Sequence, residues 1–392
     1  MNSELPEYVL NRNMIAAVRK DNAGYIAGMV RSYPWLLDSL FYSERKDDTL
    51  GLFEHKWKPP VICLFTLFAY AINYASKRVI SKLISLKADI YKSCFVADLM
   101  DDAGPEPSYR VKEMPPVSII SPFDEGFRLA AKVGYDLSRQ FSVVTTIYHD
   151  KEARNFPVVY RGFWEFCLGV SKKMQHPKEM VEITNTILSN GYDTNVLLRQ
   201  LDLFKLFSRY FHLIPGRGLQ DADDVKDVIA FMNTMIRHGC CLTEKPVANG
   251  FNKVITELLR TKCHTDETRE EMANLISCTA ALSPDLTFSQ KHDLSSIEAP
   301  PNSLEQLSLA AGCVRVIRPR IGGKRFYERV QRLNCKQGVK HCIIFGQKDP
   351  DEPKPELTPY RPTESVGDVT ETTTSKTTTA NQSPSQTNPS TN

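Results

Sequence analysis

A pattern of paired apolar residues, followed by a short exit that contains glycine or aspartate, recurs along most of this chain of 392 residues. In its clearest copy, the pairs Val79-Ile80 and Leu83-Ile84 stand one helical turn apart, and the exit is Ala88-Asp89. Such pairs form an apolar stripe on a helix, and that stripe has to be buried against another element. Because one short unit cannot bury its own stripe, the pattern predicts a stack of similar units.

Fainter copies of the pattern lie on both sides of this unit. The exits of all copies are, in order, Asp38, Asp89, Asp136, Asp193, Cys241 and Asp285. The clearest unit resembles an ankyrin repeat, whose pattern is T-P-L-H-x-A-A, then two apolar pairs, then G-A-D. The positions that match are Thr66, Phe68, Ala71, Val79, Ile80, Leu83, Ile84, Ala88 and Asp89.

Successive exits are 44 to 57 residues apart, which exceeds the roughly 33 residues of a standard ankyrin unit. We therefore expect extended loops or lengthened helices between units, or a half-repeat that the pattern misses. Armadillo or HEAT repeats, whose paired helices recur at roughly 40 to 47 residues, are the alternative. The Gly-Tyr-Asp exit at residues 191–193 favours ankyrin. The resemblance implies an all-α fold, a solenoid of divergent ankyrin-like helix pairs over residues 10–290.

Two further parts follow the predicted array. Residues 300–346 come after a linker with prolines and carry apolar residues at helical spacing, so we expect a small helical module there. Residues 347–392 have no apolar periodicity and are rich in Pro, Ser and Thr. Such a segment cannot bury enough apolar surface to offset the entropy of ordering, and we predict a disordered tail.

The module at residues 300–346 contains a string in which Leu309, Cys313 and Ile317 recur every four residues and so share one helix face. The string resembles the opening of a SOCS box, S-L-x-x-L-C-x-x-x-I-R, whose first helix inserts apolar side chains into a groove on elongin C. A register that starts at Ser303 lacks the cysteine and the Ile-Arg pair, so the later register is favoured. The resemblance implies an elongin-binding set of Ser308, Leu309, Cys313, Ile317 and Arg318.

The second half of the module is similar to the part of a SOCS box that approaches the cullin. The implied cullin-facing residues are Val330, Leu333, Val339 and Ile343, with Asn334 and Lys336 in place of the two prolines of the family. The resemblance therefore implies a substrate-recognition adaptor. Its array would bind a target protein, and its box would recruit elongin B/C and a cullin-RING ubiquitin ligase. The alternative is an ankyrin scaffold with no role in ubiquitination, in which the C-terminal helices cap the last repeat.

Basic residues are concentrated in this module. Nine lysines and arginines and a single acid, Glu328, lie between Arg315 and Lys340, although the formal charge of the whole chain is only +3. We interpret the basic run as a solvated face, and docking to an acidic partner is the alternative. The balanced charge of the rest of the chain argues against a nucleic-acid partner.

The sequence contains no pattern that is typical of catalysis or of a metal site. It lacks G-x-S-x-G, H-E-x-x-H, a phosphate-binding loop and a calcium loop. Its ten cysteines include no C-x-x-C pair, so we expect them to be small buried apolar residues in a reducing compartment. We predict a protein that is not an enzyme and that uses no cofactor or metal.

One apolar run, Val61 to Ala75, is too short to span a bilayer, and we expect it to form a buried helix. The first residues contain acids where a secretory signal would carry a basic stretch. We therefore expect a protein of the cytoplasm, or of both the cytoplasm and the nucleus, that is not secreted and has no membrane partner.

Overall fold

The computed structural model describes most of the chain as far as residue 346. The described ranges are 7–45, 61–100, 108–149, 152–170, 177–200, 203–211, 213, 216, 218–219, 221–261, 265–283 and 309–346. The predicted disordered tail, residues 347–392, lies outside them, as do Ser308, Asp285 and the linker before the C-terminal module.

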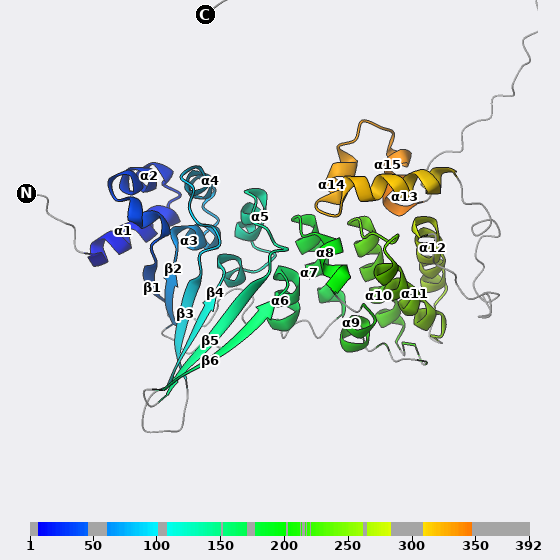
Figure 1. The fold of residues 1–392 in the computed structure, drawn as a ribbon, viewed down its shortest axis with the longest axis horizontal. Helices are drawn as coiled ribbons and strands as arrows, with labels where there is room; N and C mark the ends of the chain where they lie inside the picture. Colours follow the sequence, from blue (N-terminus) through cyan, green and yellow to red (C-terminus); the bar gives the residue numbers. More distant parts are fainter. Residues whose placement is uncertain are drawn as a thin grey trace, which may run out of the picture. The chain divides into compact units, whose positions relative to one another are not determined.

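The first half of the chain alternates helices with β-hairpins (Figure 1). Its helical elements are α1 (Glu7–Arg19), α2 (Ala23–Ser32), η1 (Pro34–Asp38), α3 (Leu67–Asn73), α4 (Lys77–Ser85), η2 (Pro116–Ile119) and α5 (Glu125–Lys132). Its strands are β1 (Phe41–Arg45), β2 (Val61–Phe65), β3 (Cys94–Met100), β4 (Ser108–Met114), β5 (Phe141–His149) and β6 (Glu152–Tyr160). The three hairpins lie side by side and form one antiparallel sheet in the order β1 to β6.

The prediction of an all-α fold is therefore wrong, and so is the buried helix expected over Val61 to Ala75. That apolar run divides at Thr66, whose hydroxyl accepts a hydrogen bond from the Ala69 N–H at 3.2 Å and begins α3. The residues before Thr66 form β2, in which alternate side chains are buried. A period of two over five residues is too short to stand out within a continuous apolar run. In the first half of the chain, the extra length between helix pairs contains hairpins.

The second half of the array is helical. Its helices are α6 (Phe163–Val170), α7 (Pro177–Ser189), α8 (Thr194–Gln200), α9 (Leu203–Tyr210), α10 (Ala222–Arg237), α11 (Lys245–Leu259) and α12 (Asp266–Leu282). Among the helices that the structure describes, none is long and apolar enough to cross a membrane.

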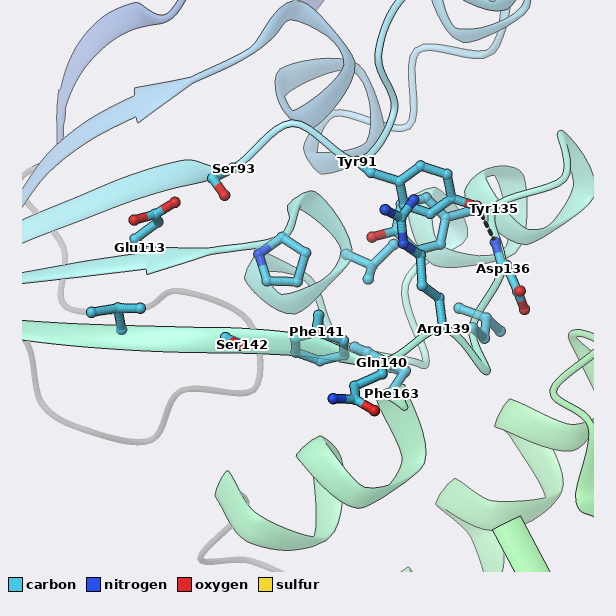
Figure 2. Close-up of a pocket in the computed structure, with 14 residues that line it drawn as sticks. Tyr91, Ser93, Glu113, Tyr135, Asp136, Arg139, Gln140, Phe141, Ser142 and Phe163 are labelled. Carbon is cyan, nitrogen blue, oxygen red and sulfur yellow. Dashed lines mark hydrogen bonds between the residues drawn. The ribbon is translucent and has the colours of Figure 1, made fainter. Parts of the chain in front are cut away.

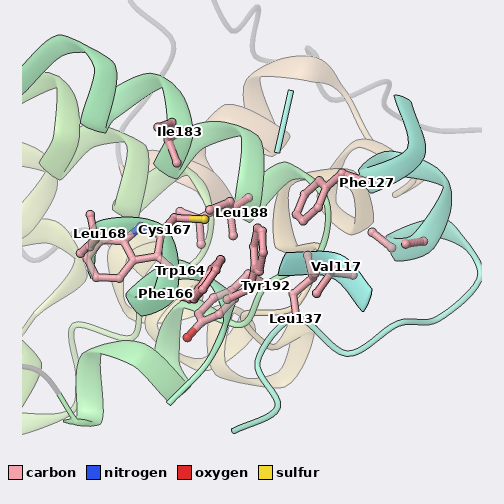
Figure 3. Packing of buried hydrophobic residues seen from close by; sticks show 14 of the residues in the cluster. Val117, Phe127, Leu137, Trp164, Phe166, Cys167, Leu168, Ile183, Leu188 and Tyr192 are labelled. Carbon is pink, nitrogen blue, oxygen red and sulfur yellow. The ribbon is translucent and has the colours of Figure 1, made fainter. Parts of the chain in front are cut away.

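One hydrophobic core joins the two halves. Figure 3 shows Val117 and Phe127, which come from η2 and α5, in the same cluster as Ile183 and Leu188 of α7. Trp164 of α6 is buried among them, and its indole N–H donates to the Thr184 hydroxyl at 2.9 Å. Because this polar group is paired, the largest side chain of the core is buried without an unsatisfied donor.

A ladder of hydrogen bonds links the exits of consecutive helix pairs. In each step the backbone N–H of one exit residue donates to a side chain of the preceding exit: Asp89 to Asp38 Oδ1 at 2.9 Å, Asp136 to the Tyr91 hydroxyl at 2.9 Å, Asp193 to the Ser138 hydroxyl at 2.9 Å, and Cys241 to Asn195 Oδ1 at 2.8 Å. From the second step on, the acceptor lies two residues beyond an exit. The exits thus stack in register and satisfy one another's backbone donors.

The last part of the chain that the structure describes is a three-helix module, α13 (Leu309–Ile321), α14 (Phe326–Gln331) and α15 (Gln337–Phe345). The module has a small core of its own, made of Phe326, Val330, Ile343 and Ile344. It also reaches the core of the array through Val314 of α13. Five of the nine described cysteines are buried, whereas Cys313 of α13 is exposed.

Candidate functional site

Arg318 fastens the C-terminal module to the array. Its buried guanidinium donates to the carbonyl oxygens of Ile343 and Ile344 in α15, and to those of Ile236 at 2.9 Å and Cys240 at 3.3 Å at the end of α10. The same guanidinium lies 4.7 Å from the centre of the Phe326 ring. Since all of these partners belong to the chain itself, Arg318 faces inward.

Phe326 makes the second close contact between the module and α10. It packs against Gly239, whose φ of +85° is one that side chains other than glycine rarely adopt. A Cβ at this position would lie 2.4 Å from the Phe326 ring, so glycine is required for the close approach. The glycine at the exit of α10 therefore allows the module to pack closely against the array.

Most of the basic residues between Arg315 and Lys340 donate hydrogen bonds to the C-terminal ends of helices. The hydrogen bonds to carbonyl oxygens in the last turn of a helix run from Arg315 to Ala280 and Ala281 of α12, from Arg325 to Ala131 of α5, from Arg329 to Ile321 of α13, and from Lys340 to Gln331 of α14. The last carbonyls of a helix lack partners within the helix and carry partial negative charge. The basic residues thus pair mainly with helix carbonyls of this chain, not with solvent alone as the sequence suggested.

The opposite face of α13 is exposed and carries apolar side chains as far as Ile317, with the exposed Arg320 one turn beyond. Cys313 is exposed, as are Val316 and Ile317, with 55% and 37% of their surface accessible. Val314 and Arg318 lie on the inner side of the same helix. An exposed apolar stripe on a helix that is held rigidly from behind is a surface suited to docking in a groove. We call Cys313, Val316 and Ile317 the α13 stripe.

The structure divides the predicted elongin-binding residues. Cys313 and Ile317 lie in the α13 stripe, and Leu309 is the first residue of α13, one turn earlier. Ser308 is outside the described residues. Arg318 has to be corrected, because its donors are used inside the fold and are not available to a partner. Val316 was missed, although its place one turn after Cys313 puts it on the same side.

The predicted cullin-facing residues are divided in the same way. Leu333, just after α14, and Val339 in α15 are exposed. Val330 and Ile343 are buried in the core of the module, so the prediction that they face a partner is wrong. A module of three short helices has to bury some apolar residues of each helix, and the sequence pattern does not separate these residues from exposed ones.

A hollow of about 240 Å³ lies where the sheet meets η2 and the exit after α5 (Figure 2). Its walls mix polar, aliphatic and aromatic side chains, the aromatic ones being Tyr91, Tyr135, Phe141 and Phe163. Figure 2 shows Glu113 at one end and Arg139 toward the other, and the Arg139 guanidinium lies 4.1 Å from the centre of the Tyr91 ring. Burial raises the pKa of Tyr135, so this wall of the hollow is a neutral phenol. No sequence motif pointed to this hollow.

Titratable side chains do not converge on a metal-binding arrangement. Within the ranges that the structure describes, no group of three or more His, Cys, Asp and Glu could hold a metal ion. His238 is buried at the end of α10 with its Nε2 3.0 Å from Asn185 Oδ1, and desolvation lowers the pKa of its ring to about 4. His238 is therefore neutral at physiological pH and shares a hydrogen bond with an amide.

Comparison with known proteins assigns no family to this chain. No protein-family model, no curated protein and no solved structure matches it.

Proposed function

We propose that the chain is a substrate-recognition adaptor, in which the array binds a target protein and the C-terminal module recruits elongin B/C and a cullin-RING ubiquitin ligase. The observation that carries the proposal is the α13 stripe. It presents Cys313, Val316 and Ile317 outward while the inner side of the helix is fixed to α10 and α12. This arrangement supports the resemblance of the module to a SOCS box. The proposal places the protein in the cytoplasm or the nucleus, where ubiquitin-ligase adaptors act.

The direct test is binding of purified elongin B/C to the full chain, measured by isothermal titration calorimetry. We expect the wild type to bind and the double variant Cys313→Asp/Ile317→Asp to lose at least 100-fold in affinity. Truncating a buried interface anchor costs on the order of 2 kcal/mol, and a charge placed in an apolar groove costs more. No binding by the wild type, or equal binding by both proteins, would overturn the proposal.

The matched control is Leu333→Asp/Val339→Asp, which changes two exposed apolar residues elsewhere in the module. This variant should bind elongin B/C with the affinity of the wild type. If the second half of the module contacts a cullin, the elongin complex of this variant should lose affinity for the cullin. A variant that loses elongin binding as well would place the elongin contact on a different face from the α13 stripe.

A capping role for the module is the second candidate, and a separate observation favours it. Arg315, Arg318 and Arg325 satisfy carbonyl oxygens at the ends of α12, α10 and α5, all of which belong to the array. Deleting residues 309–346 should therefore lower the thermal stability of the array in either case. A module that only caps would leave elongin unbound by the wild type, so the titration above separates the two functions.

A further inference from the structure

The six-stranded sheet has one face that the described helices bury over most of β1 to β4 but not along β6, and one face that they leave open. On the buried face, Phe65 and Val96 are covered, and the Tyr70 hydroxyl of α3 donates to the Ser43 hydroxyl at 2.7 Å. Directly paired residues of an antiparallel sheet point to the same side. The strand register therefore identifies the residues of the other face, which we call the outer sheet face.

A row of paired residues crosses all six strands on the outer sheet face. In strand order it consists of Tyr42, Leu64, Phe95, Glu113, Val144 and Pro157. Every member of this row is at least partly exposed. Farther from the exits, Ala97 pairs with Val111, and Tyr109 pairs with Leu99 on one side and Tyr148 on the other. The outer sheet face is thus mainly apolar.

Exposed apolar area of this kind marks a binding surface. An apolar sheet face is normally buried against another layer, and contiguous apolar patches of more than a few hundred Å² are rare on surfaces that bind nothing. The hollow beside Glu113 lies at β4 and β5, and a second hollow of about 520 Å³ lies at β1 and β2, lined by Tyr42, Leu64 and Trp35. The row therefore connects two places where large side chains can insert.

The charges of this face are acidic. Among the described strand residues, Glu44 and Glu113 are its charged side chains, and no lysine or arginine points to this side. Arg110 lies on the opposite face, where it makes a bidentate pair with Asp98 at 2.9 and 2.6 Å. Arg139, the cation beside the smaller hollow, stacks on Tyr91. A partner with basic residues around an apolar surface matches this distribution.

The geometry favours a helix as the occupant. The hollows lie about three strand spacings apart, or roughly 14 Å, which corresponds to the rise of about ten residues of α-helix. An added strand would have to pair with one of the edge strands, β1 or β6. Asn11 of α1 already hydrogen bonds both backbone groups of Tyr42 in β1, and Pro157 interrupts β6. The described strands of this face would offer no lysine or arginine to Glu44 and Glu113 of a second copy of the chain docked through the same face.

We propose that the outer sheet face binds an amphipathic helix of a target protein, with two large apolar anchors about ten residues apart and flanking lysines or arginines. This inference rests on the proposed function, because it names the class of target that the adaptor would hold. One anchor enters each hollow, and the basic flanks pair with Glu44 and Glu113.

The test is selection of helical peptides from a display library on the full chain in the absence of elongin. The library randomises the positions of one helix face and both flanks of 20-residue peptides. We expect the enriched peptides to carry two large apolar residues ten or eleven positions apart and an excess of lysine and arginine in the flanks. Absence of enrichment, loss of the helical period or an excess of acidic flanks would overturn the inference.

Two matched pairs of variants locate the binding. Tyr109→Lys changes the outer sheet face, and Phe156→Lys changes an equally exposed aromatic residue on the opposite face, at 49% and 50% accessible. Val159→Lys and Val158→Lys form a second pair, adjacent in β6 and 55% and 48% accessible. The enriched peptides should bind Tyr109→Lys and Val159→Lys at least ten-fold more weakly than wild type, and bind the other two normally. Equal binding within each pair would overturn the inference.

Glu113→Lys tests the charge match separately. It should lower the affinity for basic peptides and raise the affinity for versions whose flanks are changed to glutamate. Unchanged affinity for both kinds of peptide would contradict pairing with Glu113. Because elongin takes no part in these measurements, failure of the sheet to bind helices and failure of the module to bind elongin are distinguishable.

Discussion

The sheet-bearing half and the helical half of this chain hold their units together in different ways. In the first half, hairpins pair edge to edge and each exit makes one hydrogen bond with the next, so cohesion is spread over many similar contacts. Where the C-terminal module joins the helical half, by contrast, the single guanidinium of Arg318 links α13 to both α15 and α10, beside the contacts of Arg315 and Phe326. The contrast implies that one substitution can remove much of the cohesion between the module and the helical half but only a small part of the cohesion in the sheet-bearing half.

The largest effect is expected for Arg318→Met. The substitution removes the donor that four buried carbonyl oxygens share, and that of Ile236 keeps the Gly239 N–H at 3.0 Å. Because each buried acceptor left unsatisfied costs about 1 to 3 kcal/mol, the loss at the other three carbonyls is at least about 3 kcal/mol. Chemical denaturation should show a loss of this size in the free energy of unfolding. Arg320→Met, which changes an exposed residue of the same helix, is the control and should differ little from wild type. Equal stability of the two variants would contradict a concentrated joint at Arg318.

A smaller, pH-dependent effect is expected at His238. In sequence, this residue lies between Ile236 and Cys240, whose carbonyl oxygens accept hydrogen bonds from Arg318. Desolvation, and then the charge of Arg237, lowers the pKa of the folded-state ring from 6.5 to about 4. Between these values the unfolded chain takes up a proton that the folded chain does not. The stability present above pH 6.5 is therefore lost as the pH falls toward 4, by about 2 kcal/mol at pH 5.

The measurement is urea denaturation of wild type and His238→Gln at pH 7 and pH 5. The glutamine variant should lose about 2 kcal/mol less than wild type between the two values, because its amide does not titrate. Parallel pH profiles for the two proteins would show that His238 is not the group responsible.

The smallest effect is expected for Tyr91→Phe in the ladder of exits. It removes the hydroxyl that accepts the Asp136 N–H at 2.9 Å and leaves the ring in place. One neutral hydrogen bond contributes about 1 kcal/mol, and the free energy of unfolding should fall by that amount. A loss as large as that of Arg318→Met would remove the distinction between the two halves.

The fold was predictable where its signal was local. Apolar pairs at helical spacing identified helices such as α4 and α7, and the Ser308 to Arg318 string identified the helix that forms as α13. The hairpins were missed because the segments between the helix pairs were interpreted as loops or longer helices, and because β2 runs into α3 within a single apolar stretch. Pairing between strands depends on segments that are far apart in the sequence. A search for helical spacing therefore assigns such strands to loops.

The candidate site was predictable as a segment, and its orientation was not. Cys313, Ile317 and Arg318 are neighbours on one helix, and the sequence gives no reason to separate them. The carbonyl oxygens that accept hydrogen bonds from Arg318 belong to α15 and to the end of α10. The end of α10 lies about 80 residues earlier in the chain. The hollow beside Glu113 is likewise assembled from a strand, a 3-10 helix and an exit.

The sequence by itself determined the stacked helix pairs, the positions of their exits and the helical C-terminal module, because each rests on spacing within a few helical turns. The tertiary structure alone decided that the intervening segments pair into a sheet and that Arg318 faces inward while Cys313 faces solvent. It also decided that most basic residues between Arg315 and Lys340 donate to carbonyl oxygens at the ends of helices. The physical reason is that burial and hydrogen-bond partners depend on which other segments pack nearby. The spacing of apolar residues within one segment does not contain that information.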